Sequence, residues 1–296
     1  MDRDDTIPIS ATPINWFPGH MAVTRRLMKE NLGAVDLVLE LVDARIPKSS
    51  QNPEIDALLQ SKKRIVILNK SDLADPDQTA RWKDFLTKKG LTVLELDSKT
   101  GKNKCVQTIA LTAKHLLHEK LEKERAKGMH LPIRAMVVGI PNVGKSTLIN
   151  TLAGAKKARA ENRPGVTKTK QWVRAGEGLE LLDMPGVLWP KFEDPTVGEN
   201  LAITGAIKDS ILDSVHLAHL LLSRLVRLYP SLLLARYRLP EDALSLSLPD
   251  LFFAIGKKRG FLVSGGDIDE ERCAMVLLDE FRAGIIGRMT LEAPEE

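Results

Sequence analysis

A glycine-rich segment at residues 139–146 has the residue types and spacing of a phosphate-binding loop. The apolar run 134–138 precedes it and the helical pattern 146–152 follows, a context that disfavours an incidental glycine-rich turn. Glycines let the backbone approach phosphate oxygens, and N–H groups at a helix N-terminus supply positive potential. We expect Lys145 to contact the β- and γ-phosphates and the Ser146 hydroxyl to bind Mg²⁺. The residues assigned to this loop site are Asn142, Val143, Gly144, Lys145, Ser146 and Thr147.

An element that can read a purine base comes earlier in the chain. Asn69, Lys70 and Asp72 form an NKxD pattern at the end of the strand-like run 64–68. A carboxylate at Asp72 can accept the N1 and N2 hydrogens of guanine, a pairing that adenine does not offer. Alone, a polar turn with Asp at a helix N-cap explains the same residues. Beside a phosphate loop, the pattern predicts GTP binding and conflicts with an ATP-using P-loop kinase.

Ser98 and Lys99 follow the next β-rich run, residues 91–96. A second base-proximal loop is expected at this place, so we assign both residues to the nucleotide site. Ser and Lys in a polar turn without function remain the alternative.

A second phosphate-side element lies at residues 183–186, again after an apolar run. We expect Asp183 to hold Mg²⁺, directly or through water, and the Gly186 N–H to meet the γ-phosphate. Loss of that phosphate would release the loop. Between this element and the phosphate loop, Thr167 is the preferred Mg²⁺ ligand and Thr169 the second choice. For either residue, a solvated turn threonine without function is the alternative.

The order of these motifs is reversed relative to an ordinary guanine-nucleotide-binding domain, where the phosphate loop comes first and NKxD near the end. The sequence therefore predicts a circularly permuted GTPase whose original ends are fused near residues 127–132. The core would end just after the Asp183 loop, so nucleotide state would act directly on whatever follows.

The residue that handles the attacking water is less evident. Val187 stands where Ras-like enzymes carry a water-orienting glutamine, and a valine cannot position water. His20 is the candidate within this chain, because a histidine can orient or deprotonate water near neutral pH. A helix-start or packing role for His20 is the alternative.

The hydrophobic patterns predict an α/β fold followed by a helical region. Strands are expected at 35–42, at the runs ending at 69 and 97, and at the two phosphate-side runs, with a long helix at 105–126. We expect a mostly parallel sheet flanked by helices over residues 1–194 and a smaller all-α domain over 195–296. The helical patterns of the second part cover residues 199–207, 214–228, 243–255 and 269–283.

Composition narrows the function classes for these 296 residues. Aromatics at 4% disfavour stacking platforms for single-stranded RNA, and a net charge of +4 makes a mild case for a polyanionic partner. Cys105 and Cys273 lack zinc or redox spacing, and His216 and His219 lack partners at metal spacing. With neither a membrane-spanning run nor a signal peptide apparent, we expect a cytoplasmic protein without a membrane partner.

Four segments give the chain a family resemblance. They are the Trp-Phe-Pro-Gly-His-Met run at 16–21, Asp-Ala-Arg-Ile-Pro at 43–47, Gly-Lys-Lys-Arg-Gly at 256–260 and Ser-Gly-Gly at 264–266. With the motif order, they resemble the bacterial ribosome biogenesis GTPase A family (YlqF-type), and the likeness runs nearly end to end. The resemblance implies that His20 acts on the hydrolytic water and that Asn142 is a K⁺ ligand. It also favours rRNA contacts at Lys257, Lys258 and Arg259 over a solvated charged turn.

By this resemblance, we expect a GTP-hydrolysing assembly factor acting late in large-subunit maturation. It would bind rRNA and the pre-subunit with GTP, leave on hydrolysis, and be slow until the subunit stimulates it. The expected cofactors are GTP/GDP, Mg²⁺ and K⁺. The expected partners are the rRNA and ribosomal proteins of the large-subunit precursor, and DNA is not expected to bind. We expect the protein to be a monomer. The alternative is an RNA-associated guanine-nucleotide sensor with incidental hydrolysis and a structural His20.

Overall fold

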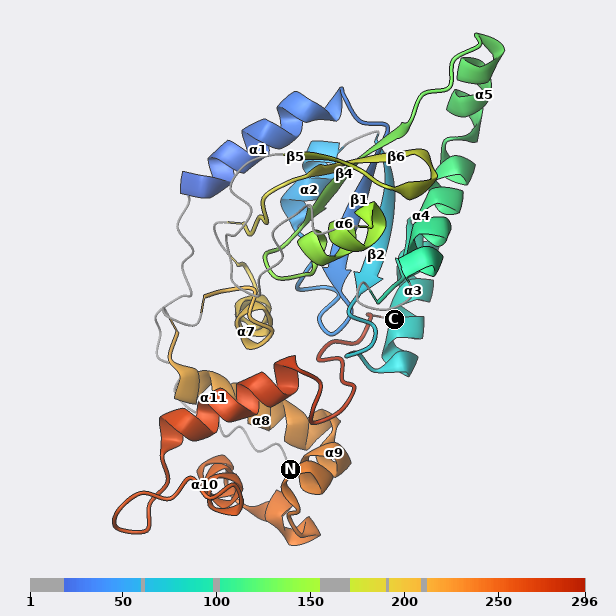
Figure 1. Cartoon of the computed structure of the whole chain (residues 1–296). Coiled ribbons are helices and arrows are strands. Elements are labelled where there is room, and N and C mark those ends of the chain that lie inside the picture. Colours follow the sequence, from blue (N-terminus) through green and yellow to red (C-terminus); the bar gives the residue numbers. More distant parts are fainter. Residues whose placement is uncertain are drawn as a thin grey trace.

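The computed structural model describes residues 19–59, 62–97, 102–154, 171–189, 192–208 and 212–295. Within them, a sheet runs in the order β3-β2-β1-β4-β6-β5 (Figure 1). Neighbouring strands are parallel except β5, which pairs antiparallel with β6. The strands are β1 (Leu37–Asp43), β2 (Lys63–Asn69), β3 (Thr92–Glu95), β4 (Ile133–Gly139), β5 (Gln171–Arg174) and β6 (Leu179–Asp183).

The central strands are buried on both faces, as their near-continuous apolar runs predict. Every residue of β1 is buried, and so are the last five residues of β2. On one face, α3 (Pro76–Lys88) packs Trp82 and Leu86 against β2 and β3. The larger core also takes in residues of α1 (Gly19–Leu32), α2 (Pro53–Leu59) and α6 (Lys145–Ala153).

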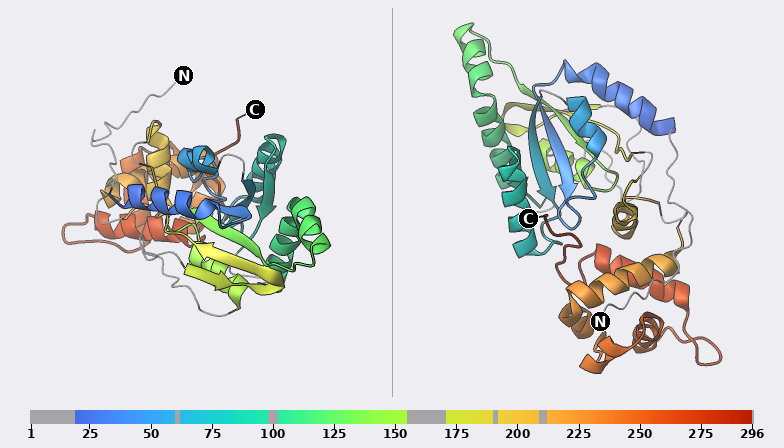
Figure 2. Two further views of the ribbon diagram at one scale, coloured as in Figure 1. Left: turned by 90° about the horizontal axis from the view of Figure 1, so that it is seen from above. Right: turned by 180° about the vertical axis from the view of Figure 1, so that it is seen from behind.

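The long helix expected over 105–126 is wrong in one respect, because it is broken at Leu117 into α4 (Lys102–Leu116) and α5 (His118–Ala126). Cys105, Ile109, Ala113 and Leu117 form a buried stripe at helical spacing that ends at the break. No residue of α5 is buried, and the helix projects away from the sheet (Figures 1 and 2). Without a buried face, α5 has no apolar packing to hold it against the sheet.

The expected helical region follows the sheet. Its helices are α7 (Pro195–Ile203), α8 (Ser214–Leu228), α9 (Pro230–Tyr237), α10 (Leu248–Lys258) and α11 (Glu270–Arg282). The prediction for α8 agrees with its bounds, whereas α7 begins and ends four residues early because Asp194 caps it and Pro195 opens it. The segment 243–255 divides into a 3₁₀ turn (Glu241–Ser245) and α10, which Ser247 caps. Helix α9, opened by Pro230, was not predicted.

The chain does not end within the helical region. After α11, residues 284–295 run back to the sheet part, and the C-terminus lies near α3 (Figures 1 and 2). Trp82 of α3 donates its indole N–H to Glu292 O at 3.0 Å, and Leu291 N donates to Arg45 O at 2.8 Å. The boundary at residue 195 stays a prediction, and it would place this returning segment with the helical part.

The described residues include no single helix long and apolar enough to cross a membrane, although α8 and α9, bent by 116°, pass that test of length and composition together.

The packing of the helical region can be tested by truncating a buried leucine in α8. Leu221 is fully buried in α8, whereas Leu228 in the same helix is 40% exposed. We expect Leu221→Ala to lower the free energy of unfolding by about 3 kcal/mol, because the residual cavity adds to the lost transfer free energy. Leu228→Ala is the control and should change it by less than about 0.5 kcal/mol. Urea unfolding followed by circular dichroism measures both, and equal effects would contradict this packing.

Candidate functional site

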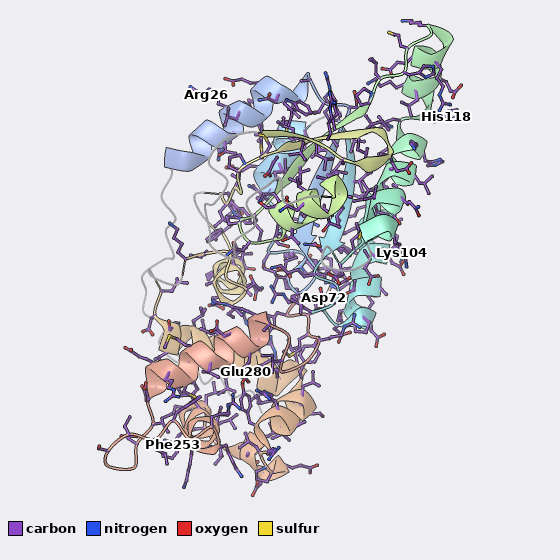
Figure 3. The ribbon with its side chains drawn as sticks, in the orientation of Figure 1. Arg26, Asp72, Lys104, His118, Phe253 and Glu280 are labelled. Atoms are coloured by element: carbon purple, nitrogen blue, oxygen red, sulfur yellow. The ribbon has the colours of Figure 1, made fainter. Side chains whose placement is uncertain are left out.

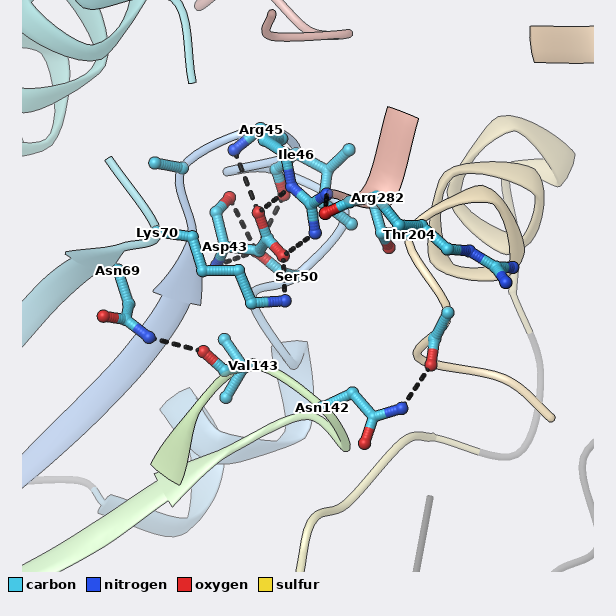
Figure 4. Close-up of polar contacts among 12 residues, drawn as sticks. Asp43, Arg45, Ile46, Ser50, Asn69, Lys70, Asn142, Val143, Thr204 and Arg282 are labelled. Atoms are coloured by element: carbon cyan, nitrogen blue, oxygen red, sulfur yellow. Dashed lines mark hydrogen bonds and ion pairs between the residues drawn. The ribbon is translucent and has the colours of Figure 1, made fainter. Parts of the chain in front are cut away.

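The carboxyl edge of the sheet gathers the motifs that are far apart in the sequence. Strands β1, β2, β4 and β6 end at Asp43, Asn69, Gly139 and Asp183. Asp43 pairs with Asn69 in register, and Leu41 pairs with Gly139. Because parallel strands end together at one edge, the reversed chain order brings the base-side and phosphate-side loops side by side, the usual ligand position in open α/β sheets (Figure 4).

A direct bond joins the two loops. Asn69 donates its side-chain N–H to Val143 O at 2.7 Å, and it does so across Gly144. A Cβ at Gly144 would lie 2.3 Å from Asn69 Nδ2, and the φ of Gly144 is +105°. Only glycine satisfies both the close approach and the backbone conformation.

Lys145 lies inside the phosphate loop. Its side chain is buried and donates to Gly139 O at 3.0 Å and Ile140 O at 2.8 Å. An ammonium group has three N–H donors, so one remains for a ligand when the bonds to the described residues are counted. Burial lowers the pKa of Lys145 to about 8, against the opposing effect of Asp183.

The residues after Lys145 open helix α6. Ser146 and Thr147 are partly buried in its first turn, and Gly144 is its N-cap without a side-chain cap bond. The first N–H groups of a helix have no partner within it, so this turn is suited to an anion.

Asp183 is the acidic residue of this edge. Its side chain is buried, and among the described residues its Oδ1 has no hydrogen-bond partner. Burial raises its pKa to about 6, although Lys145 acts in the opposite direction. A buried carboxylate oxygen and the Ser146 hydroxyl are both hard oxygen donors, the kind of ligand that Mg²⁺ takes together with phosphate oxygens.

The segment after Asp183 packs directly on the phosphate loop. A Cβ at Gly186 would lie 2.8 Å from Pro141 N and 3.0 Å from Lys145 Nζ, so the position requires glycine. Val187 donates its N–H to Gly139 O at 3.3 Å, and its side chain is buried. Val187 therefore packs in the core.

On the base side, a buried ion cluster holds Lys70. Asp43 accepts from Lys70 Nζ at 3.0 Å and from Arg45 Nη2 at 2.8 Å and Nε at 3.0 Å (Figure 4). Burial opposes ionisation of Asp43, but the charges of Arg45 and Lys70 outweigh it and hold its pKa well below the usual range. Sequence reasoning used residues 43–47 only as a family signature and missed this role. The signal was present, since Asp43 ends the strand next to the one that ends at Asn69.

Asn142 makes the contact between the phosphate loop and the helical region. Its φ is +57°, and its Nδ2 donates to Gly205 O at 2.6 Å, just after α7 (Figure 4). Arg282 of α11 donates to Ile203 O and Ala202 O at the end of the same helix. The contact was not predicted; the K⁺ role of Asn142 stays a prediction.

Of the expected RNA contacts, Lys257 and Lys258 are exposed in the last turn of α10. Arg259 differs, because it donates to the buried carboxylate of Glu280 at 2.7 Å. That carboxylate also accepts from Arg236 and Tyr237. Arg259 thus holds α10 to α11, while the RNA assignment of all three residues stays a prediction.

Several predicted site residues lie outside what the structure describes. Ser98, Lys99, Thr167 and Thr169 fall in undescribed segments, and His20 has a described backbone, in the first turn of α1, but no described side chain. Their roles stay predictions. His219 lies partly buried in α8, as expected; it bonds to Val215 O at 2.9 Å and packs on Phe252.

Comparison with known proteins identifies relatives of this chain. Residues 134–226 match the family model described as 50S ribosome-binding GTPase. The chain is 51% identical to ribosome biogenesis GTPase A of Priestia megaterium, covering 96% of this chain and 98% of that protein. It belongs to the ribosome biogenesis GTPase A family. The Bacillus cereus protein of that name is 48% identical, covering 96% of this chain and 95% of its own length.

A solved structure supports the same assignment. The GDP-bound YlqF of Thermotoga maritima aligns with a TM-score of 0.66 at 27% identity, covering 92% of this chain and all of that one. The expected family and α/β fold class are confirmed. This member of the ribosome biogenesis GTPase A family is a GTPase that hydrolyses GTP.

The close packing of Gly186 yields a prediction. We expect Gly186→Ala to reduce GTP hydrolysis by about 10²-fold, because the methyl group would displace Pro141 and Lys145 from their present geometry. Phosphate release at saturating GTP is the measurement. Gly33→Ala is the control, since no atom of the described part of the chain lies within 4 Å of its Cβ position. Near-normal turnover by Gly186→Ala would contradict the required fit.

Proposed function

We propose that one guanine nucleotide spans the carboxyl edge of the sheet, and that its hydrolysis drives a cycle on the large ribosomal subunit precursor. The observation that carries the proposal is the Asn69 to Val143 bond, which puts the base-side and phosphate-side loops in direct contact. The family model's description and the relatives' names support the ribosomal part.

At the base, Asp72 accepts the two guanine N–H groups, and Asn69 and Lys70 hold its loop in place. Lys70 is fixed by the buried charge of Asp43, which restricts its aliphatic chain to the edge where the base would lie. Ser98 and Lys99 complete this side in the proposal.

At the phosphates, the third Lys145 N–H and the first turn of α6 bind the β- and γ-phosphates, with Val143, Gly144 and Thr147 supplying backbone N–H groups. Ser146, Asp183 and Thr167 hold Mg²⁺, which when bound supplies positive charge at the phosphate oxygens. Asn142 uses its amide N–H on Gly205, so its oxygen is available to K⁺. His20 orients or deprotonates the water, because the buried Val187 cannot.

In this proposal, the position of the helical region depends on whether the γ-phosphate is bound. Gly186 lies against the phosphate loop, and the chain leads from there directly into α7, whose end Asn142 already contacts. A change at the γ-phosphate would therefore reach α7 through two routes. Lys257, Lys258 and Arg259 contact rRNA phosphates, so they bind the protein to the pre-subunit. In the proposed cycle the protein is a cytoplasmic monomer that binds late in maturation and leaves after hydrolysis.

The base assignment is tested by exchanging donors and acceptors. Asp72→Asn replaces one carboxylate oxygen with an N–H donor, which fits xanthine better than guanine. We expect the affinity ratio of GDP to XDP to fall by about 10³-fold or more, because unpaired polar groups are then buried with guanine. Titration with fluorescent GDP and XDP measures it. An unchanged ratio would remove Asp72 from the site.

The hydrolytic assignment is tested at His20. His20→Ala should slow single-turnover GTP cleavage on isolated precursor subunits by about 10²-fold and leave GTP affinity near normal. An unchanged cleavage rate would instead favour a nucleotide sensor with a structural His20. Cosedimentation separates the readings further: the assembly cycle requires large-subunit binding that is tighter with a non-hydrolysable GTP analogue than with GDP.

A further inference from the structure

The returning C-terminal segment packs against the loop that carries Asp72. We name residues 286–292 the C-terminal strap; Ile286, Met289, Thr290 and Leu291 are buried in it. Figure 3 places Asp72 between the sheet and the helical region, where the strap passes. The strap has no part in the motifs that identify a GTPase.

Arg288 of the strap bonds to both sides of Asp72. Its Nη2 donates to Ser71 O at 2.8 Å, and its Nε donates to Ala74 O at 2.9 Å. Ser71 precedes Asp72, and Ala74 follows two residues later. One planar guanidinium group therefore fixes the two ends of the turn on which the carboxylate stands.

The next two strap residues extend the contact. Met289 N donates to Leu73 O at 3.0 Å, and Thr290 Oγ1 accepts from Asp75 N at 3.2 Å. The neighbours of Asp72 from 71 to 75 are thus each hydrogen-bonded to the strap. A turn lacks the ladder bonds of a strand, so these bonds supply the restraint that secondary structure does not.

The strap is itself anchored in the helical region. The Tyr229 hydroxyl, between α8 and α9, accepts from Thr290 N at 3.0 Å and lies 3.1 Å from Asp75 Oδ2. Gly287 has a φ of +149°, and a Cβ there would lie 2.8 Å from Leu232 of α9. The strap is therefore fixed against α9 on one side and against the turn at residues 71–75 on the other.

Discrimination between purine bases requires the Asp72 carboxylate to be held in a precise position. A carboxylate that accepts two N–H groups of one purine edge must lie in the plane of that edge, and an error of about 1 Å breaks the bidentate geometry. We propose that the C-terminal strap belongs to the guanine-recognition site, with Arg288 as the positioning residue for Asp72. The inference rests on the proposed role of Asp72 and adds a specificity determinant from the opposite end of the chain.

The test compares GDP with IDP, which lacks the 2-amino group and can offer Asp72 one N–H instead of two. We expect Arg288→Ala in the full-length chain to weaken GDP binding by about tenfold and IDP binding less, so the affinity ratio of GDP to IDP falls severalfold. Arg288→Lys keeps the charge but reaches one carbonyl, so its ratio should be intermediate. Arg227→Ala, an exposed arginine in the last turn of α8, is the control and should keep the wild-type ratio.

A merely structural strap gives a different pattern. It would lower thermal stability and weaken both nucleotides equally, with the GDP to IDP ratio unchanged in Arg288→Ala and Arg288→Lys; that result overturns the inference. Asp72→Asn, measured in parallel, separates the two proposals. If it abolishes discrimination while Arg288→Ala leaves it intact, the strap inference alone fails; if it leaves discrimination intact, the role of Asp72 fails as well.

Discussion

The amide of Asn69, bonded to Val143 O across Gly144, is the contact on which the rest of this site depends. It joins a loop after β2 to a loop after β4, which are separated by more than seventy residues. Strand β1 lies between those two strands, so the parallel sheet delivers both loops to one edge before any side chain acts. The reversed order of the motifs is therefore immaterial to the geometry, since the edge depends on strand neighbours and not on chain order.

A buried cluster of charged residues also fixes side chains at this edge of the sheet. Asp43 is held ionised by Arg45 and Lys70, and the Arg45 guanidinium also lies 5.4 Å from the centre of the Phe281 ring in α11. A buried ion cluster contributes little net stability compared with apolar residues of the same shape, so its value lies in fixing positions. Here it fixes a base-side lysine and reaches the helical region through one arginine. Asn142 on Gly205 and the strap on residues 71–75 are further contacts between the helical region and the site.

The sequence predicted the helices and strands whose apolar residues recur periodically, and it predicted the polar residues at the strand ends. Runs such as 64–68 and 134–138 are apolar because both faces of their strands are buried, and the polar residues at their ends become the site. The antiparallel β5, the break at Leu117 and the short helix α9 were missed, because four to nine residues carry too little periodicity. The strap was beyond pattern reasoning for a different reason, because it is made by contacts between residues far apart in sequence. A tail of mixed residues such as 284–292 has the same local appearance whether it is packed or exposed. The Asp43 cluster joins Asp43 to its near neighbour Arg45 and to Lys70, and its one sequence signal was an acidic residue at the end of a strand.

If one nucleotide spans the edge of the sheet, Asp72 and Lys145 both contact it. A crystal structure of the full chain with Mg²⁺ and a non-hydrolysable GTP analogue would show this. We expect guanine N1 and N2 within hydrogen-bond distance of the Asp72 carboxylate, and the β- and γ-phosphates of the same molecule around Lys145 Nζ. A nucleotide whose phosphates lie in the loop while its base lies away from Asp72 would contradict it.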